Sequence, residues 1–217
     1  SPWSLGALDL ANRIVVAPMC QYSSVDGNAQ DWHVIHMGNM ALSGAGLLII
    51  EATAVSAEGR ITPGCLGLYS QENEAALKRV LNAVEPYALA PIAIQLAHAG
   101  RKASSHVPWE GGAQIQLTTP GAWQAVAPSA IAQREGEDLP TALDEDGLNK
   151  IRDDFAAAAK RSVDLGFRGI EVHMAHGYLL HQFLSPLANQ RSDHYGGSLE
   201  NRMRFPLVVF DAGNAAV

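Results

Sequence analysis

The fold is decided by the stretch Gly169-Ile170-Glu171-Val172-His173-Met174-Ala175-His176-Gly177-Tyr178. Its first five residues are mainly apolar and predict a short buried strand that ends at His173. The residues before it predict a helix over about 148–165, because apolar side chains recur there at helical spacing, acidic residues precede them and Gly166 follows. A helix that leads into a short apolar strand is typical of an α/β fold.

The same alternation of strand and helix occurs three more times. Apolar runs predict strands at 14–18, 47–52 and 91–96. Helical spacing predicts helices over about 33–43 and 72–88, and Ser198, after a loop, is the expected N-cap of a last helix. Because the strands are near-continuous apolar runs, they predict a parallel sheet that is covered on both faces.

Polar or reactive residues follow the predicted strands at their carboxyl ends, namely Met19-Cys20, Ala52-Thr53, Gln95 and His173. In a (β/α)8 barrel this face carries the active site. A doubly wound sheet also binds ligands there, but no G-x-G-x-x-G follows the first strand. We therefore expect an α/β fold of the (β/α)8 TIM-barrel type, with only the first four β/α units present, since a complete barrel takes about 250 residues.

The 217 residues suit a single domain, 1–217. Residues 1–13 are expected to form a hairpin that caps one end of the barrel. The segment 101–146 is expected to be a long loop that acts as a lid, since so long a loop in a compact domain is usually functional or disordered.

Composition excludes several classes of function. The formal net charge of -7 argues against nucleic-acid binding, and no apolar run is long enough to span a membrane. The first residues do not resemble a signal peptide. The two cysteines, Cys20 and Cys65, do not make a disulfide framework, so we expect a cytoplasmic protein with free thiols.

The histidines at positions 173 and 176 are candidates for oxyanion stabilisation. Two imidazole N–H groups can converge on one oxygen, and the nearby Tyr178 hydroxyl can deliver a proton. The alternatives are a structural hydrogen-bonded pair and half of a zinc site. Zinc requires a third ligand, and no H-E-x-x-H motif is present.

Four other residues can be explained either by a functional role or by an ordinary structural or solvent-exposed one. A lone cysteine such as Cys20 is more often a small buried hydrophobe than a reactive group. Gln95 ends an apolar strand, where a ligand or a neighbouring backbone must satisfy its amide. Arg101 and Lys102 could attract an anionic cofactor, but without further context the sequence favours solvated side chains.

Several motifs, in order along the whole chain, resemble the old yellow enzyme family. More narrowly they resemble its bacterial, xenobiotic-reductase-like subclass, in which a cysteine occupies the Cys20 position. The matching segments are 12–14, 17–22, 51–55, 59–62, 95–102, His173 to Tyr178, 183–186, Asn189, Arg191, Asp193, 195–198 and 201–202.

This resemblance implies an ene-reductase that holds FMN without a covalent bond. NADPH or NADH would reduce the FMN, which would then pass hydride to an activated alkene such as an enone, an enal or a nitro compound. His173 and His176 would bind the substrate oxygen, Tyr178 would donate the proton, and Tyr22 would line the substrate pocket. The residues implied in cofactor binding are Pro18, Met19, Cys20, Ala52, Gln95 and His173, with Cys20 also tuning the flavin and so counted as catalytic.

Family members continue through four further units, which carry an arginine and two glycine-containing loops that grip the FMN phosphate. We therefore expect this chain to be an N-terminal half that forms a homo-oligomer or pairs with a C-terminal half. The alternative is a non-catalytic half-barrel that self-associates or pairs with another chain, because open strand edges demand a partner. A less favoured alternative is a zinc hydrolase that uses His173 and His176.

Overall fold

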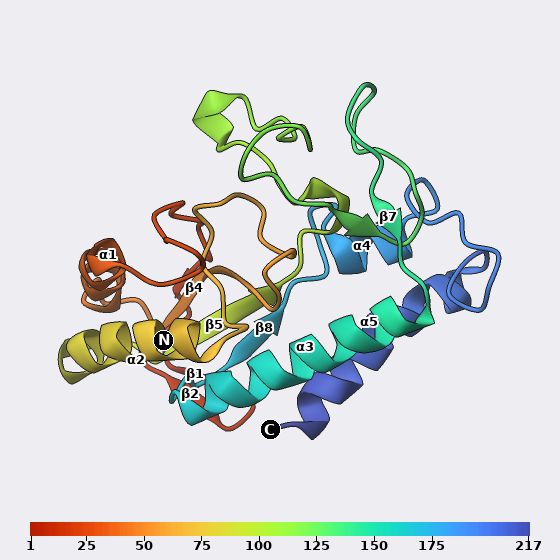
Figure 1. Cartoon of the computed structure of the whole chain (residues 1–217). Helices are drawn as coiled ribbons and strands as arrows, with labels where there is room; N and C mark the ends of the chain where they lie inside the picture. The colour runs from red at the N-terminus through yellow and green to blue at the C-terminus, as the bar shows by residue number, and fades with distance from the viewer.

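The computed structural model describes residues 1–217 and is organised around one parallel sheet (Figure 1). Its strands are β3 (Val15–Val16), β4 (Leu47–Ala54), β5 (Ile92–Ala97) and β8 (Ile170–Val172), adjacent in that order. All three pairings are parallel. The four predicted strands are therefore present and are neighbours in chain order, as expected for consecutive β/α units.

Four long helices follow the strands: α1 (Asp31–Ala41), α2 (Gln71–Val84), α3 (Glu145–Asp164) and α5 (Leu199–Ala215). Helices α2, α3 and α5 each begin after a capping residue that the sequence supplies. The side chains of Ser70, Asp144 and Ser198 accept a hydrogen bond from a backbone N–H in the first turn of the helix. The prediction that the second helix reaches residue 88 is wrong. A 3-10 turn, Glu85–Tyr87, replaces its end because Pro86 has no N–H to continue the helix.

The two faces of the sheet carry different cores. Alternate residues, including Leu48, Ile50 and Ile94, pack with the helices in one cluster of 27 buried side chains. The residues between them face the other way, where Leu47 and Ala93 pack against Leu10. Leu10 belongs to an antiparallel hairpin of β1 (Trp3–Leu5) and β2 (Leu8–Leu10).

A bulge interrupts the pairing of β4 with β5. The register shifts between Ile50 and Ala52, so Glu51 is the extra residue. The buried Glu51 carboxylate lies 3.2 Å from Nε2 of His33 and accepts the backbone N–H of Gln21 at 3.0 Å. The bulge thus turns a charged side chain out of the sheet and gives it partners on α1 and on the loop after β3.

Two local predictions need correction. The first strand was expected over 14–18, but only Val15 and Val16 pair, because β4 is their sole neighbour. A short helix, α4 (Leu179–Leu184), stands where a loop was expected. The segment 101–146 also carries short elements: η2 (Gly100–Lys102) overlaps its start, η3 (Pro108–Glu110) follows, and β6 (Val126–Ala127) pairs in parallel with β7 (Thr141–Ala142).

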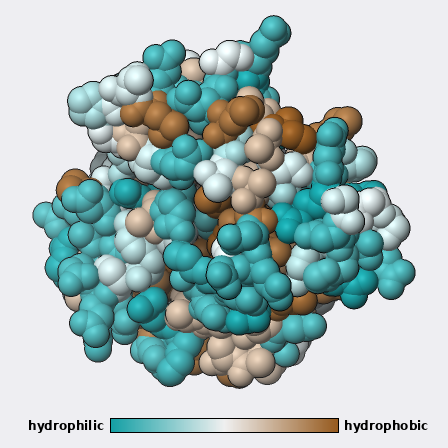
Figure 2. Space-filling model, turned by 45° about the vertical axis from the view of Figure 1, so that its right-hand side comes forward, coloured by the Kyte–Doolittle hydropathy of each residue, from teal (hydrophilic) through white to brown (hydrophobic).

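The surface is mainly hydrophilic, but apolar residues gather in a band near the top of the view and in a smaller patch near its centre in Figure 2. No helix combines the length and the apolar character that a bilayer crossing requires.

Candidate active site

Three side chains of the decisive stretch meet just beyond the carboxyl end of β8. His173 is buried, and its Nε2 lies 3.3 Å from Nδ1 of His176. The Tyr178 ring stands edge-on to the His173 imidazole, with the ring centroids 5.0 Å apart. The structure therefore brings both imidazoles and the phenol ring together in one cluster.

A tight turn directs His176 back toward His173. His176 has φ +56° and Gly177 has φ +73°, so two successive residues are left-handed. Lys102 donates from Nζ to the His176 carbonyl oxygen at 2.6 Å, and a Cβ at position 177 would lie 3.0 Å from the same Nζ. A side chain here would press on this lysine, and the left-handed backbone favours glycine. Left-handed non-glycine residues are strained and cluster at functional sites.

Gln182, which the sequence left without a role, fixes this turn from α4. Its buried amide donates to the carbonyl oxygens of Gly177 at 2.8 Å and Ala99 at 3.1 Å, and its oxygen accepts the N–H of Arg101. Gln182 thereby ties the loop after β5 to the loop after β8. The available signal was an amide inside an apolar run, since a buried amide must find partners.

The surroundings set the protonation of His173 and Tyr178. Burial, followed by repulsion from His176, lowers the pKa of His173. Ala175 N–H donates to His173 Nδ1 at 3.2 Å, so the neutral ring carries its proton on Nε2. Burial raises the pKa of the Tyr178 hydroxyl. Both side chains are therefore hydrogen-bond donors at neutral pH.

Cys20 lies against Cys65, a thiol to which the sequence assigned no role. The neighbouring Cys65 thiol, together with burial, raises the pKa of the Cys20 thiol. Gly64 permits this approach, since a Cβ there would lie 2.6 Å from the Tyr22 carbonyl oxygen. Cys20 is therefore a neutral thiol, and the loops after β3 and β4 bring the two sulfurs together.

Ala52 and Gln95 lie opposite each other on neighbouring strands. The Gln95 side-chain amide donates to the carboxylate of Glu171, its neighbour on β8. Its side-chain oxygen accepts no hydrogen bond from the chain, which leaves an acceptor for a ligand N–H. Glu171 was overlooked in the sequence, although a carboxylate inside an apolar strand was a signal.

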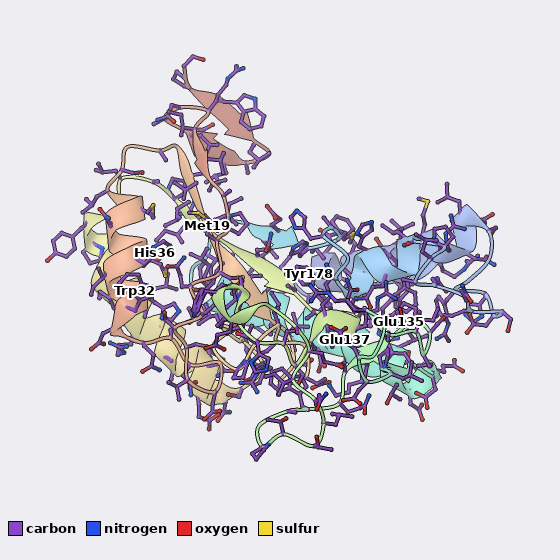
Figure 3. The ribbon with its side chains drawn as sticks, turned by 90° about the horizontal axis from the view of Figure 1, so that it is seen from above. Met19, Trp32, His36, Glu135, Glu137 and Tyr178 are labelled. Atoms are coloured by element: carbon purple, nitrogen blue, oxygen red, sulfur yellow. The ribbon has the colours of Figure 1, made fainter.

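Pro18 and Met19 follow β3. The Met19 side chain is exposed and lines a small cavity with His33 and His36 of α1. Figure 3 shows Met19 near His36 and away from Tyr178. The Met19 side chain thus faces α1, and only its backbone remains at the strand end.

The segment 101–146 rises above the carboxyl ends of the strands (Figure 1). It is anchored by Trp123, whose indole N–H donates to the Glu58 carbonyl oxygen at 3.0 Å. Trp109, 71% exposed, stands edge-on to Tyr22 with centroids 5.4 Å apart. Below this segment, Tyr22 and Tyr178 line one pocket of about 190 Å³.

No group of three or more His, Cys, Asp or Glu side chains is arranged to hold a metal ion. His173 and His176 therefore lack the third protein ligand that a zinc site requires.

Comparison with known proteins decides the family. The model of the NADH:flavin oxidoreductase / NADH oxidase family matches residues 1–217. The chain belongs to this family. A NADH:flavin oxidoreductase of Gibberella zeae is 46% identical over 214 residues, which are 97% of this chain and 52% of that protein.

Solved structures agree with this NADH:flavin oxidoreductase assignment. Morphinone reductase superposes with a TM-score of 0.85 at 36% identity, over 99% of this chain and 57% of that one. An old yellow enzyme homologue from Zymomonas mobilis gives 0.83 at 30% identity, over 99% and 59%. The resemblance to old yellow enzymes and the partial TIM-barrel fold are thereby confirmed. The chain spans little more than half the length of these relatives.

Proposed function

We propose that this chain forms part of an FMN-dependent ene-reductase, which reduces activated alkenes with electrons from NADH or NADPH. The observation that carries this proposal is the cluster at the end of β8, where His173 Nε2 and His176 Nδ1 are 3.3 Å apart beside the Tyr178 ring. Two imidazoles and a protonated phenol suit a reaction in which negative charge develops on an oxygen and a carbon must then receive a proton.

The chain's residues fit the ring of FMN. Gln95 keeps a side-chain oxygen that no group of the chain satisfies, and Ala52 beside it is small enough to leave space above the sheet. The backbone of Pro18 and Met19 and the Cys20 thiol would complete the contacts. Bound FMN would supply hydride transfer, the chemistry that side chains cannot perform. Because Cys20 is a neutral thiol, its expected role is a hydrogen bond or polarisable contact near the ring, not nucleophilic attack.

Each residue of the cluster has a defined task in this proposal. His173 donates from Nε2 to the carbonyl or nitro oxygen of the substrate, and His176 provides a second imidazole beside it. Tyr178 gives up the proton of its hydroxyl, which makes no hydrogen bond within the chain. Tyr22 lines the same pocket, and the segment 101–146 covers it and limits access of water.

We also propose that the active form contains further β/α units beside β3 and β8. Both are edge strands, and large apolar side chains stand exposed at each edge: Ile14 (66%) near β3, and Phe210 (50%) and Val217 (60%) near β8. The last two line an apolar groove of about 360 Å³ between β8, α3 and α5. Unpaired edges and apolar grooves of this kind bind a partner.

The test separates the two half-reactions by stopped-flow absorbance on FMN-loaded protein. We expect His173→Ala and Tyr178→Phe to slow reoxidation by 2-cyclohexenone about 100-fold or more, while reduction of the flavin by NADPH is little changed. Tyr87→Phe is the matched control, because Tyr87 is 71% exposed and far along the sequence from the cluster. Full alkene turnover in both active-site variants would show that the roles are wrongly assigned.

Cofactor content and assembly are measured on the same sample. A flavin absorbance near one per active unit, with sedimentation showing a complex larger than the 217-residue chain, supports the proposal. A colourless self-associated chain that does not bind added FMN would favour the non-catalytic half-barrel.

A further inference from the structure

The pocket beside Tyr22 and Tyr178 has an unusual charge. Its wall carries three cationic side chains, Arg101, Lys102 and Arg134, and a single carboxylate, Glu137. Three positive charges against one negative leave a local excess of +2, whereas the chain as a whole carries -7. Figure 3 shows Glu137 on the same side of the molecule as Tyr178.

None of the three cations forms an ion pair with a carboxylate of the chain. Arg101 donates to the carbonyl oxygens of Ile131 at 3.3 Å and Ala132 at 3.2 Å, which orient the guanidinium without neutralising it. Its Nε is buried without a partner. Lys102 donates only to the His176 carbonyl oxygen, and the Arg134 side chain makes no hydrogen bond within the chain.

The carboxylate in the wall is already engaged. Glu137 accepts backbone N–H groups of Arg134 at 3.1 Å and Gln114 at 3.4 Å, so it closes the loop and offsets only one of the three positive charges. Burial, followed by repulsion from Arg101 and Arg134, lowers the pKa of Lys102. An arrangement in which like charges crowd one another is stabilised when an anion enters.

We propose that this pocket is an anion subsite, which binds a phosphate or carboxylate group of a small molecule whose reactive part lies against Tyr178. The position of that reactive part rests on the proposed function, whereas the anion site itself does not. The three cations come from positions 101, 102 and 134, all within the segment 101–146 that lies over the carboxyl ends of the strands. An anionic ligand that binds these cations would therefore also hold the segment 101–146 over the strand ends.

The anion has two possible sources. The nicotinamide reductant carries phosphates, and a substrate alkene can carry a carboxylate. Both groups accept the charge-assisted hydrogen bonds that arginine and lysine offer.

The first test is calorimetric titration of the chain with inorganic phosphate at low ionic strength, where charge screening is weak. We expect Arg134→Gln to weaken phosphate binding about tenfold, since a charged hydrogen-bond donor is lost. Lys78→Gln on α2 removes one exposed cation outside the pocket and should leave binding within about twofold. Glu137→Gln removes the opposing charge and should tighten binding about threefold.

The second test identifies the source. Binding of NAD⁺ or NADP⁺ that Arg134→Gln weakens and Lys78→Gln does not would assign the anion to the reductant, since both dinucleotides carry phosphates. Tighter binding of 3-oxocyclohex-1-ene-1-carboxylate than of 2-cyclohexenone, with the same loss, would assign it to the substrate.

The proposal is overturned if phosphate does not bind, if Arg134→Gln and Lys78→Gln behave alike, or if Arg134→Gln weakens the binding of neither the dinucleotides nor the carboxylate ligand. Phosphate titration requires no flavin and no turnover. If the chain binds phosphate as described but does not bind FMN, the result contradicts the proposed function and still supports the anion subsite.

Discussion

Gly177 gives a prediction whose size can be worked out from the structure. It has φ +73°, and a Cβ there would lie 3.0 Å from Nζ and 3.1 Å from Cε of Lys102. An L-residue in this conformation costs about 1–2 kcal/mol. Displacing Lys102 from the His176 carbonyl oxygen adds about 1 kcal/mol, a low value for a charged hydrogen bond because the lysine is only partly buried. Gly177→Ala should therefore lower the free energy of unfolding by about 2–3 kcal/mol.

Urea unfolding followed by circular dichroism measures this loss of free energy. In thermal unfolding of a chain of this size, the same loss should lower Tm by about 5–10 °C. Gly197→Ala is the matched control. Its φ is +80° and an added Cβ has nothing within 4 Å, so it should show only the backbone cost of about 1–2 kcal/mol. In a Lys102→Ala background the extra cost at position 177 should disappear. Equal losses for Gly177→Ala and Gly197→Ala in the unmodified chain would refute the argument.

Three further predictions concern stability. Glu51→Gln removes a buried carboxylate with two partners and should cost about 2–3 kcal/mol in urea unfolding, whereas the partly exposed Glu74→Gln should cost about 1 kcal/mol or less. Burial lowers the pKa of His98 to about 4. Below about pH 6.5 the unfolded chain therefore binds a proton that the folded chain excludes. The free energy of unfolding should fall by about 3 kcal/mol as the pH drops from about 6.5 to about 4. His98→Asn should flatten that part of the profile, and an unchanged slope would contradict the assignment. Phe205→Ala should cost about 3–5 kcal/mol because this ring is buried, whereas the half-exposed Phe210→Ala should cost about 1 kcal/mol or less; similar losses would contradict the packing.

The elements that could be predicted are those whose signal is local. The strand at 47–52 was visible as a continuous apolar run, and the helix starting after Asp144 as apolar spacing behind a capping residue. The apolar residues at 47–52 do not by themselves predict the bulge at Glu51. Its position depends on how β4 pairs with β5, and that register is a property of two strands.

Helix α4 was missed for a related reason. Six residues, Leu179–Leu184, are too few for helical periodicity to be distinguished from any short apolar run. The helix is held by packing: Phe183 meets Phe205 of α5 with ring centroids 4.5 Å apart, and Gln182 bonds to two loops. The contact between Cys20 and Cys65 was equally invisible, since 45 positions of sequence separate them and only the loop geometry joins them.

The sequence by itself determined the order of strands and helices, the parallel sheet, and the placement of His173, His176 and Tyr178 at a strand end. These follow from periodicity and composition, which act over a few residues. The tertiary structure alone decided that His173 is neutral with its proton on Nε2, that Lys102 and Gln182 hold the turn at Gly177, and that three unpaired cations surround the pocket beside Tyr178. Burial and charge pairing depend on which distant segments come together, and spacing along the chain carries no record of that.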